Sequence, residues 1–239
     1  MRYLALLGVD EANVPPLGTP ERNAIHAAYA HFAEVAADAL VAGDALQPTA
    51  TATTLRYGDG DEPLVTTGPF AETAEALGGY YVLEADTLDD ALDLARQIPS
   101  ARHSWVGVRP MVAWQPAPAG GPAAGDCYMA LVYGKESEAD VPGTAAWDEG
   151  AASHGRFAEA AGTSVVAGGA LHPLDSTTTV RVRDGEMLVT DGPFSEVAEV
   201  VGGFYVLAAP STSRAIELAR MIPVGPGNAV EVRPIQVFE

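Results

Sequence analysis

Leu-Val-Thr-Thr-Gly-Pro-Phe at residues 64–70 returns as Leu-Val-Thr-Asp-Gly-Pro-Phe at residues 188–194, so one motif is present twice. The shift of 124 positions between them holds to the end of the chain, and about half of the aligned positions are identical. Upstream of the motif the shift becomes 125, as Phe32 and Phe157 show. Self-similarity at a fixed spacing is the signature of a repeated structural unit. The chain of 239 residues is therefore two tandem copies of one small domain.

A stretch rich in proline, glycine and alanine separates the two copies. It covers residues 113–126, and this composition suits an exposed connector without regular structure. We therefore expect a first domain at residues 1–112, a linker at residues 113–126 and a second domain at residues 127–239.

Both copies show the same order of elements: strand, helix, two or three strands, helix, strand. In the first copy Thr19 is a predicted helix N-cap followed by a proline, and Thr87 begins a second helix with a capping box. In the second copy Asp184-Gly185 separates two strand-like runs and favours a tight hairpin turn. This order predicts the α+β class, with two tandem ferredoxin-like units whose helices cover one sheet face. Open sheet edges need a partner, so we expect the copies to pair as an intramolecular pseudo-dimer.

The composition excludes several partners and compartments. The formal net charge of −19 disfavours nucleic acids and anionic membranes, and the scattered acidic residues are typical of a solvated surface. A cationic protein partner is the alternative. No uninterrupted apolar run is long enough for a membrane helix. The single cysteine, Cys127, excludes an internal disulfide and favours a reducing, cytoplasmic location.

Four motifs of the second copy resemble the DGPF subgroup of the YCII-related family. They are Gly-Ala-Leu-His-Pro at residues 169–173, Thr-Asp-Gly-Pro-Phe at 190–194, Gly-Gly-Phe-Tyr-Val-Leu at 202–207 and Val-Arg-Pro at 232–234. The resemblance covers both copies and leaves only the connector outside. It implies a dimeric α+β barrel, here formed within one chain, with a cleft where the two sheets meet.

The resemblance also carries expectations about function. Relatives in the wider family carry a histidine and aspartate pair proposed as catalytic, and some resemble enzymes that remove chloride from hydroxylated chloroaromatics. DGPF proteins as a group lack a settled activity. Their genes often lie beside genes for extracytoplasmic-function sigma factors, which implies a regulatory or stress role.

Asp191 and His154 are the candidate catalytic residues. Asp191 belongs to the repeated motif of the second copy, where the first copy has Thr67, and a turn aspartate that binds backbone donors is the structural alternative. His154 takes the position of Tyr29 on the apolar stripe of its helix. A histidine near a carboxylate can act as a general base near neutral pH, whereas a buried, hydrogen-bonded histidine has only a structural role.

Four further residues are candidates for ligand binding. Arg233 precedes a proline at the end of a strand, where it could hold a carboxylate or phenolate, although a salt bridge explains it equally well. Tyr205 needs a hydrogen-bond partner if it is buried. His172 takes the position of Gln47 in the first copy. Glu196 takes the position of Glu72, so both copies have a glutamate there. No helical zinc motif, phosphate loop or nucleophilic serine motif is present, so we expect no metal and no cofactor.

Two functional hypotheses follow, and the sequence does not decide whether the protein is an enzyme. In the first, a cleft of the second copy binds or transforms a small aromatic or carboxylated metabolite by acid–base chemistry. In the second, the chain is a non-catalytic interaction module linked to a sigma factor. Two-copy chains could also pair further as homodimers.

Overall fold

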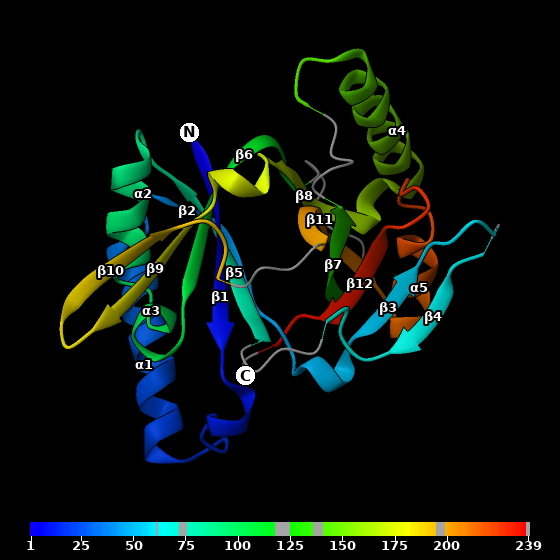
Figure 1. The fold of residues 1–239 in the computed structure, drawn as a ribbon. Helices are drawn as coiled ribbons and strands as arrows, with labels where there is room; N and C mark the ends of the chain where they lie inside the picture. The colour runs from blue at the N-terminus through cyan, green and yellow to red at the C-terminus, as the bar shows by residue number, and fades with distance from the viewer. Residues whose placement is uncertain (61, 72–75, 118–124, 136–140, 195–198, 238–239) are drawn as a thin grey trace. The chain divides into compact units, whose positions relative to one another are not determined.

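The computed structural model describes the chain except for residues 61, 72–75, 118–124, 136–140, 195–198 and 238–239 (Figure 1). The fold is of the α+β class, with mostly antiparallel strands and few helices. The first copy contains β1 (Arg2–Val9), η1 (Glu11–Asn13), α1 (Pro20–Val35), β2 (Leu40–Ala45), η2 (Thr49–Thr51), β3 (Thr53–Arg56), β4 (Leu64–Thr67), β5 (Ala76–Glu84), α2 (Leu88–Ala95), α3 (Ser100–His103) and β6 (Val106–Gln115).

The second copy repeats this order with small differences. It contains β7 (Asp126–Lys135), α4 (Ala145–Ala161), η4 (Gly162–Ser164), β8 (Val165–Leu171), η5 (Leu174–Ser176), β9 (Thr178–Arg183), β10 (Glu186–Asp191), β11 (Glu199–Ala209), α5 (Thr212–Ala219) and β12 (Ala229–Pro234). The second copy has no described helix at the place of α3, because residues 224–227 form a loop there.

The chain divides into two compact units that differ from the two sequence copies. Unit 1 consists of residues 1–45, 72–111 and 174–196, and unit 2 consists of residues 46–71, 112–173 and 197–239. The β3–β4 hairpin of the first copy thus belongs to unit 2, and the β9–β10 hairpin of the second copy belongs to unit 1 (Figure 1). The two copies have exchanged hairpins.

Each exchanged hairpin extends the sheet of its unit in the same way. In unit 1 the strands run in the order β2, β5, β1, β6, β9, β10. In unit 2 the equivalent order is β8, β11, β7, β12, β3, β4. Val106 lies opposite Val180 in unit 1, and Val230 lies opposite Leu55 in unit 2. These pairs are equivalent under the repeat, so one register serves both units.

The core of each unit includes residues of the exchanged hairpin. In unit 1, Val180 of β9 packs in the same buried cluster as Tyr3 of β1, Phe32 of α1 and Ala91 of α2. In unit 2, Leu55 of β3 packs in one buried cluster with core residues of the second copy, which include Tyr128, Phe157, Tyr205, Leu207, Leu218 and Val230. Removing the hairpin would therefore expose apolar core surface.

Local signals of the sequence are confirmed where they depend on short-range chemistry. Thr19 caps α1 by accepting the N–H of Arg22, and Thr87 and Asp90 form the predicted capping box of α2. Asp184 and Gly185 adopt φ angles of 52° and 83°, as a tight hairpin turn requires.

The predicted start of the linker is wrong by three residues. Strand β6 continues to Gln115, so residues 113–115 belong to the sheet and not to an irregular connector. The side chain of Trp114 packs at a tilted angle near Phe204, with ring centroids 6.4 Å apart. This aromatic contact and the strand-forming residues before it outweigh the proline-rich composition that begins at Pro116. The barrel that the resemblance implies for the two units together stays a prediction.

Candidate functional site

The repeated Gly-Pro-Phe segment forms a turn that closes each exchanged hairpin. Gly68 and Gly192 have φ angles of 108° and 91°, a region that side-chain-bearing residues rarely adopt. Thr54 donates its hydroxyl to the carbonyl of Gly68 at 2.8 Å, and Thr179 does the same to Gly192 at 2.8 Å. The repeated Gly-Pro-Phe segment therefore has a structural role in both copies.

In unit 2 the phenylalanine of this segment lies between a cation and an aromatic ring. Phe70 stacks on Tyr133 of β7, with centroids 4.3 Å apart and an interplanar angle of 19°. The guanidinium of Arg56 also lies over the Phe70 ring, 4.4 Å from its centroid, and donates a hydrogen bond to the Phe70 carbonyl. Cation–π and stacking contacts of this kind hold the hairpin against β7.

A buried ion pair lies beside this stack. Glu231 and Arg233 are 1% and 2% exposed, and both the Nε and the Nη2 of Arg233 donate to Oε1 of Glu231. The other carboxylate oxygen, Oε2, accepts the backbone N–H of Phe70 at 2.8 Å. Burial and the neighbouring carboxylate of Glu231 raise the pKa of Tyr133 well above its ordinary value. The carboxylate of Glu231 is thus paired with Arg233 and also binds the backbone of the exchanged hairpin.

Unit 1 holds its hairpin with the equivalent phenylalanine and arginine but with another aromatic partner. Phe194 stacks on Trp105 at 5.2 Å and 13°, and the guanidinium of Arg181 lies 4.3 Å from the Phe194 centroid. Under the repeat, Gly8 stands in place of Tyr133 and Gly107 in place of Glu231. A Cβ atom on Gly8 would lie 2.5 Å from the indole nitrogen of Trp105, so the glycine makes room for the tryptophan. The ion pair of unit 2 has no equivalent at these positions in unit 1.

His154 and Tyr205 form a hydrogen-bonded pair under helix α4. The Nδ1 of His154 lies 2.9 Å from the Tyr205 hydroxyl. Burial lowers the pKa of the His154 imidazole and raises the pKa of Tyr205 to about 12. Both groups are therefore neutral near pH 7. Phe157 packs edge-on against the Tyr205 ring at 5.0 Å, and Gly168 leaves the room that the ring needs.

The first copy has a different hydrogen bond at the position of His154. Tyr29 replaces His154, and its hydroxyl lies 2.7 Å from Ser100 Oγ at the start of α3. The residue of the second copy that corresponds to Ser100 is Val224, which has no hydroxyl. The bond between helix and loop is therefore lost in unit 2, and His154 bonds to the sheet residue Tyr205 instead.

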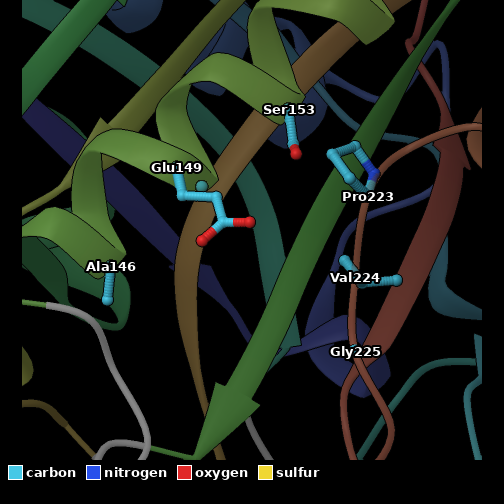
Figure 2. A pocket seen from close by; sticks show the side chains of 7 residues that line it. Ala146, Glu149, Ser153, Pro223, Val224 and Gly225 are labelled. Carbon is cyan, nitrogen blue, oxygen red and sulfur yellow. The ribbon is translucent and has the colours of Figure 1, made fainter.

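An open pocket of about 450 Å³ lies in unit 2 between α4 and the loop after α5. Figure 2 shows Glu149 and Ser153 on the helix and Pro223 and Val224 on the facing segment. The full lining is Ala146, Glu149, Gly150, Ser153, Pro223, Val224 and Gly225. Gly150 corresponds to Ile25 of the first copy, so the second copy has no branched side chain at this position of the lining. A pocket of this volume suits a small metabolite.

The residues selected from the sequence are spread over different parts of the molecule. His154 and Tyr205 lie together in unit 2, whereas Asp191 lies on β10 in unit 1, where its side chain is exposed. A relay from Asp191 to His154 is therefore built by neither unit alone and stays a prediction. Arg233 is bound to Glu231, and His172 is partly buried just after β8. Glu196 lies outside the described residues.

The described part of the chain contains neither a cluster of metal-binding side chains nor a membrane-spanning helix. No group of three or more histidine, cysteine, aspartate or glutamate side chains there could hold a metal ion. Within the same residues, no helix has the length and apolar character needed to cross a membrane.

The model of the YCII-related domain matches residues 1–115 and again residues 127–239. The chain belongs to this family. An uncharacterized protein of Rhizobium meliloti (strain 1021) is 45% identical to this YCII-related chain over 73 residues, which are 30% of the chain and 58% of the relative. The match thus spans less than two thirds of the relative's length. The family boundaries follow the sequence copies, whereas the compact units follow the exchanged hairpins.

Sequence reasoning missed Glu231, Tyr133 and Gly150. The signal was present in the differences between the copies, because each aligns with a residue of another kind: Gly107, Gly8 and Ile25, respectively. Positions shared by the copies describe the YCII-related fold. Positions that differ between them mark the buried ion pair and the pocket of unit 2.

Proposed function

We propose that the second copy of this YCII-related protein binds a small aromatic molecule in the pocket between α4 and residues 223–225. The observation that carries the proposal is that three residues between the helix and the loop differ together from those of the first copy. Gly150, His154 and Val224 replace Ile25, Tyr29 and Ser100, so the second copy lacks a branched side chain at the pocket and lacks the hydrogen bond that joins Tyr29 to Ser100 in the first copy.

The lining of the pocket offers both apolar and polar contacts to a small ligand. The apolar part of the ligand would contact Ala146, Pro223 and Val224, while Ser153 supplies a polar contact. His154 comes four residues after the lining residue Gly150, so the two residues lie on the same face of α4.

The lining favours neutral ligands over carboxylates. Glu149 contributes a negative charge to the pocket, and none of its seven lining residues is cationic. Arg233, the arginine expected to hold an anion, is buried against Glu231. We therefore propose an aromatic ligand and not a carboxylated one. Proton transfer by His154 with Asp191, like the sigma-factor link, stays a prediction.

The test is a thermal-shift screen of the intact chain with neutral aromatic compounds, repeated with Gly150→Ile. This variant restores the bulk found in the first copy and also raises helix propensity, so it should fold. A ligand present at a hundredfold excess over its Kd adds about 2.7 kcal/mol of stability. We expect stabilisation of the wild type that is lost in Gly150→Ile.

Gly155→Ala is the matched control, because a Cβ at Gly155 meets nothing within 4 Å. It should keep the ligand response of the wild type. A ligand that stabilises Gly150→Ile as much as the wild type would place binding elsewhere and contradict the proposal.

A further inference from the structure

We propose that two copies of this chain form a dimer through strand β4, whose free edge pairs antiparallel with the same edge of the second chain. This inference is independent of the pocket in unit 2. Strand β4 is the last strand of the unit 2 sheet, and among the described strands it pairs only with β3 (Figure 1). All of its residues are exposed, and the exposed fractions of Leu64 and Val65 are 65% and 38%. A free edge with exposed apolar side chains is a ready site for pairing with another strand.

The hydrogen bonds between β3 and β4 determine which backbone groups of β4 face outward. Gly68 donates its N–H to the carbonyl of Ala52 at 2.8 Å, so these two residues, just beyond the strands, form a hydrogen-bonded pair. Hydrogen-bonded and non-hydrogen-bonded pairs alternate along an antiparallel ladder. Val65 and Thr67 therefore lie in non-hydrogen-bonded pairs, and their N–H and C=O groups point away from β3. The free edge offers the donors and acceptors of these two alternate residues.

The sequence of β4 is complementary to itself in the antiparallel direction. When Val65 of one chain lies opposite Thr67 of the other, the reverse pair forms as well, and Thr66 lies opposite Thr66 on the two-fold axis. The outward backbone groups of both chains then meet as hydrogen-bonded pairs. A threonine pair is stabilising across strands, and β-branched side chains fit a pleated sheet. The partner that fits this edge is therefore a second copy of the chain.

The absence of charge on β4 allows two acidic chains to approach each other there. The chain has a formal net charge of −19, whereas Leu64–Thr67 contains no ionisable side chain. The equivalent strand β10 differs at one outward position, because Asp191 takes the place of Thr67. Gly192 donates its N–H to the carbonyl of Thr177 at 2.8 Å, so the backbone of Asp191 also faces the free edge of its hairpin.

Asp191 prevents the same pairing at β10. In an equivalent pairing the two Asp191 carboxylates would lie diagonally across the ladder, about 7–8 Å apart. Like charges at this distance repel each other, and a charged residue on an edge strand is a common protection against pairing. The difference between Thr67 and Asp191 thus assigns dimerisation to β4, and it gives Asp191 a role that needs no histidine.

Two prolines limit the length of the new ladder. Pro63 precedes β4 and Pro69 follows it by one residue, and neither has a backbone N–H. The pairing therefore ends with β4, and so short an interface makes the dimer weak and dependent on concentration.

The first experiment is sedimentation equilibrium of the intact chain over a concentration series up to about 1 mM, where weak dimers are populated. We expect the average mass to rise from one chain toward two. Thr67→Asp copies the residue of β10, so the hairpin should tolerate it, and it should weaken dimerisation by about tenfold. Thr163→Asp adds the same charge at an exposed position of η4 and should dimerise as the wild type does. A wild type that remains a single chain throughout, or a dimer that Thr67→Asp leaves unchanged, would overturn the proposal.

Asp191→Thr is the reciprocal variant. It removes the charge from the edge of β10, so we expect species larger than a dimer at concentrations where the wild type stops at two chains. The double variant Thr67→Asp with Asp191→Thr should return to a dimer, now formed through β10. If Asp191→Thr has the same mass as the wild type at every concentration, the role assigned to Asp191 is wrong.

Amide hydrogen exchange measured by NMR locates the contact in the intact chain. The N–H of Thr66 is already bonded to β3, whereas those of Val65 and Thr67 face outward. We expect Val65 and Thr67 to exchange more slowly at high than at low protein concentration, with little change at Thr66. A dimer that protects neither Val65 nor Thr67 would use another surface and contradict the proposal.

Discussion

Oε2 of Glu231 accepts the backbone N–H of Phe70 at 2.8 Å, although the two residues are 161 positions apart in the sequence. Glu231 lies on the last strand of the second copy, and Phe70 closes the hairpin that the first copy contributes to unit 2. The same carboxylate neutralises Arg233. The single buried carboxylate of Glu231 therefore both binds the exchanged hairpin and pairs with the buried Arg233.

Glu231→Gln tests this double role. The variant keeps an acceptor for Phe70 but breaks the buried ion pair between Glu231 and Arg233, and the loss of one partner of a buried pair costs about 3 kcal/mol or more. We expect a fall of that size in the free energy of unfolding measured with urea. Glu217→Gln is the control, because its ion pair with Arg214 is exposed and such pairs contribute about 0–1 kcal/mol. Equal effects of the two substitutions would contradict the buried pair.

Phe70→Ala and Phe194→Ala compare the two hairpins directly. Phe70 is 8% exposed and Phe194 is 37% exposed, although both lie beside an arginine and an aromatic ring. Truncation of a buried phenylalanine costs about 3–5 kcal/mol, and the cost falls with exposure. We expect Phe70→Ala to lower the free energy of unfolding in urea by about 3 kcal/mol and Phe194→Ala to lower it by about 1 kcal/mol. A larger effect at Phe194 would be inconsistent with the packing described.

The sequence predicted the α+β class, the repeat and the caps because these depend on local patterns. Thr87 and Asp90 are three positions apart, and Asp184-Gly185 is a two-residue turn signal. The exchange of hairpins was not predictable in this way. A β3 strand can pair with either equivalent edge, β6 or β12, and the two edges share Val-Arg-Pro at residues 108–110 and 232–234. Contacts distant in sequence, such as Phe70 with Glu231, decide between them.

The candidate site was predicted in part. His154 and Tyr205 were both selected from the sequence and are hydrogen-bonded in the structure. Arg233 was selected as a residue that could hold an anion at the mouth of a cleft, and this role stays a prediction. In the structure it pairs with Glu231 two residues away, because alternate residues of a strand share a face. Gly150 lines the pocket, and a glycine within a helix gives no positive sequence signal for a site.

Gly8→Ala tests how unit 1 accommodates Trp105. The new Cβ would lie 2.5 Å from both Ser104 Oγ and the indole nitrogen, and both contacts are too short to remain. Insertion of a methyl group into packed structure costs about 1–3 kcal/mol. We expect that loss in urea unfolding, with a shift in tryptophan fluorescence. In the Trp105→Ala background the cost of Gly8→Ala should be smaller, since one of the two clashes is gone.

Gly155→Ala is the control for the glycine substitution. Its Cβ points into open space on α4, and alanine is favoured over glycine in a helix interior by about 1 kcal/mol. We therefore expect Gly155→Ala to increase stability while Gly8→Ala decreases it. The same sign for both would argue against crowding at Trp105.

The stability of the protein should depend on pH through His154. Burial lowers the pKa of the folded imidazole below the ordinary value of 6.5, so the unfolded chain binds the proton first as the pH falls. Stability then decreases with falling pH from about 6.5 down to the folded pKa, and it is independent of this group above that window. His154→Gln cannot titrate and should lack this part of the slope in urea unfolding between about pH 8 and pH 5. His31→Gln, at an exposed position of α1, is the matched control and should keep the slope of the wild type. Parallel curves for the wild type and His154→Gln would mean that the imidazole is not desolvated, and the pairing with a protonated Tyr205 would lose its physical basis.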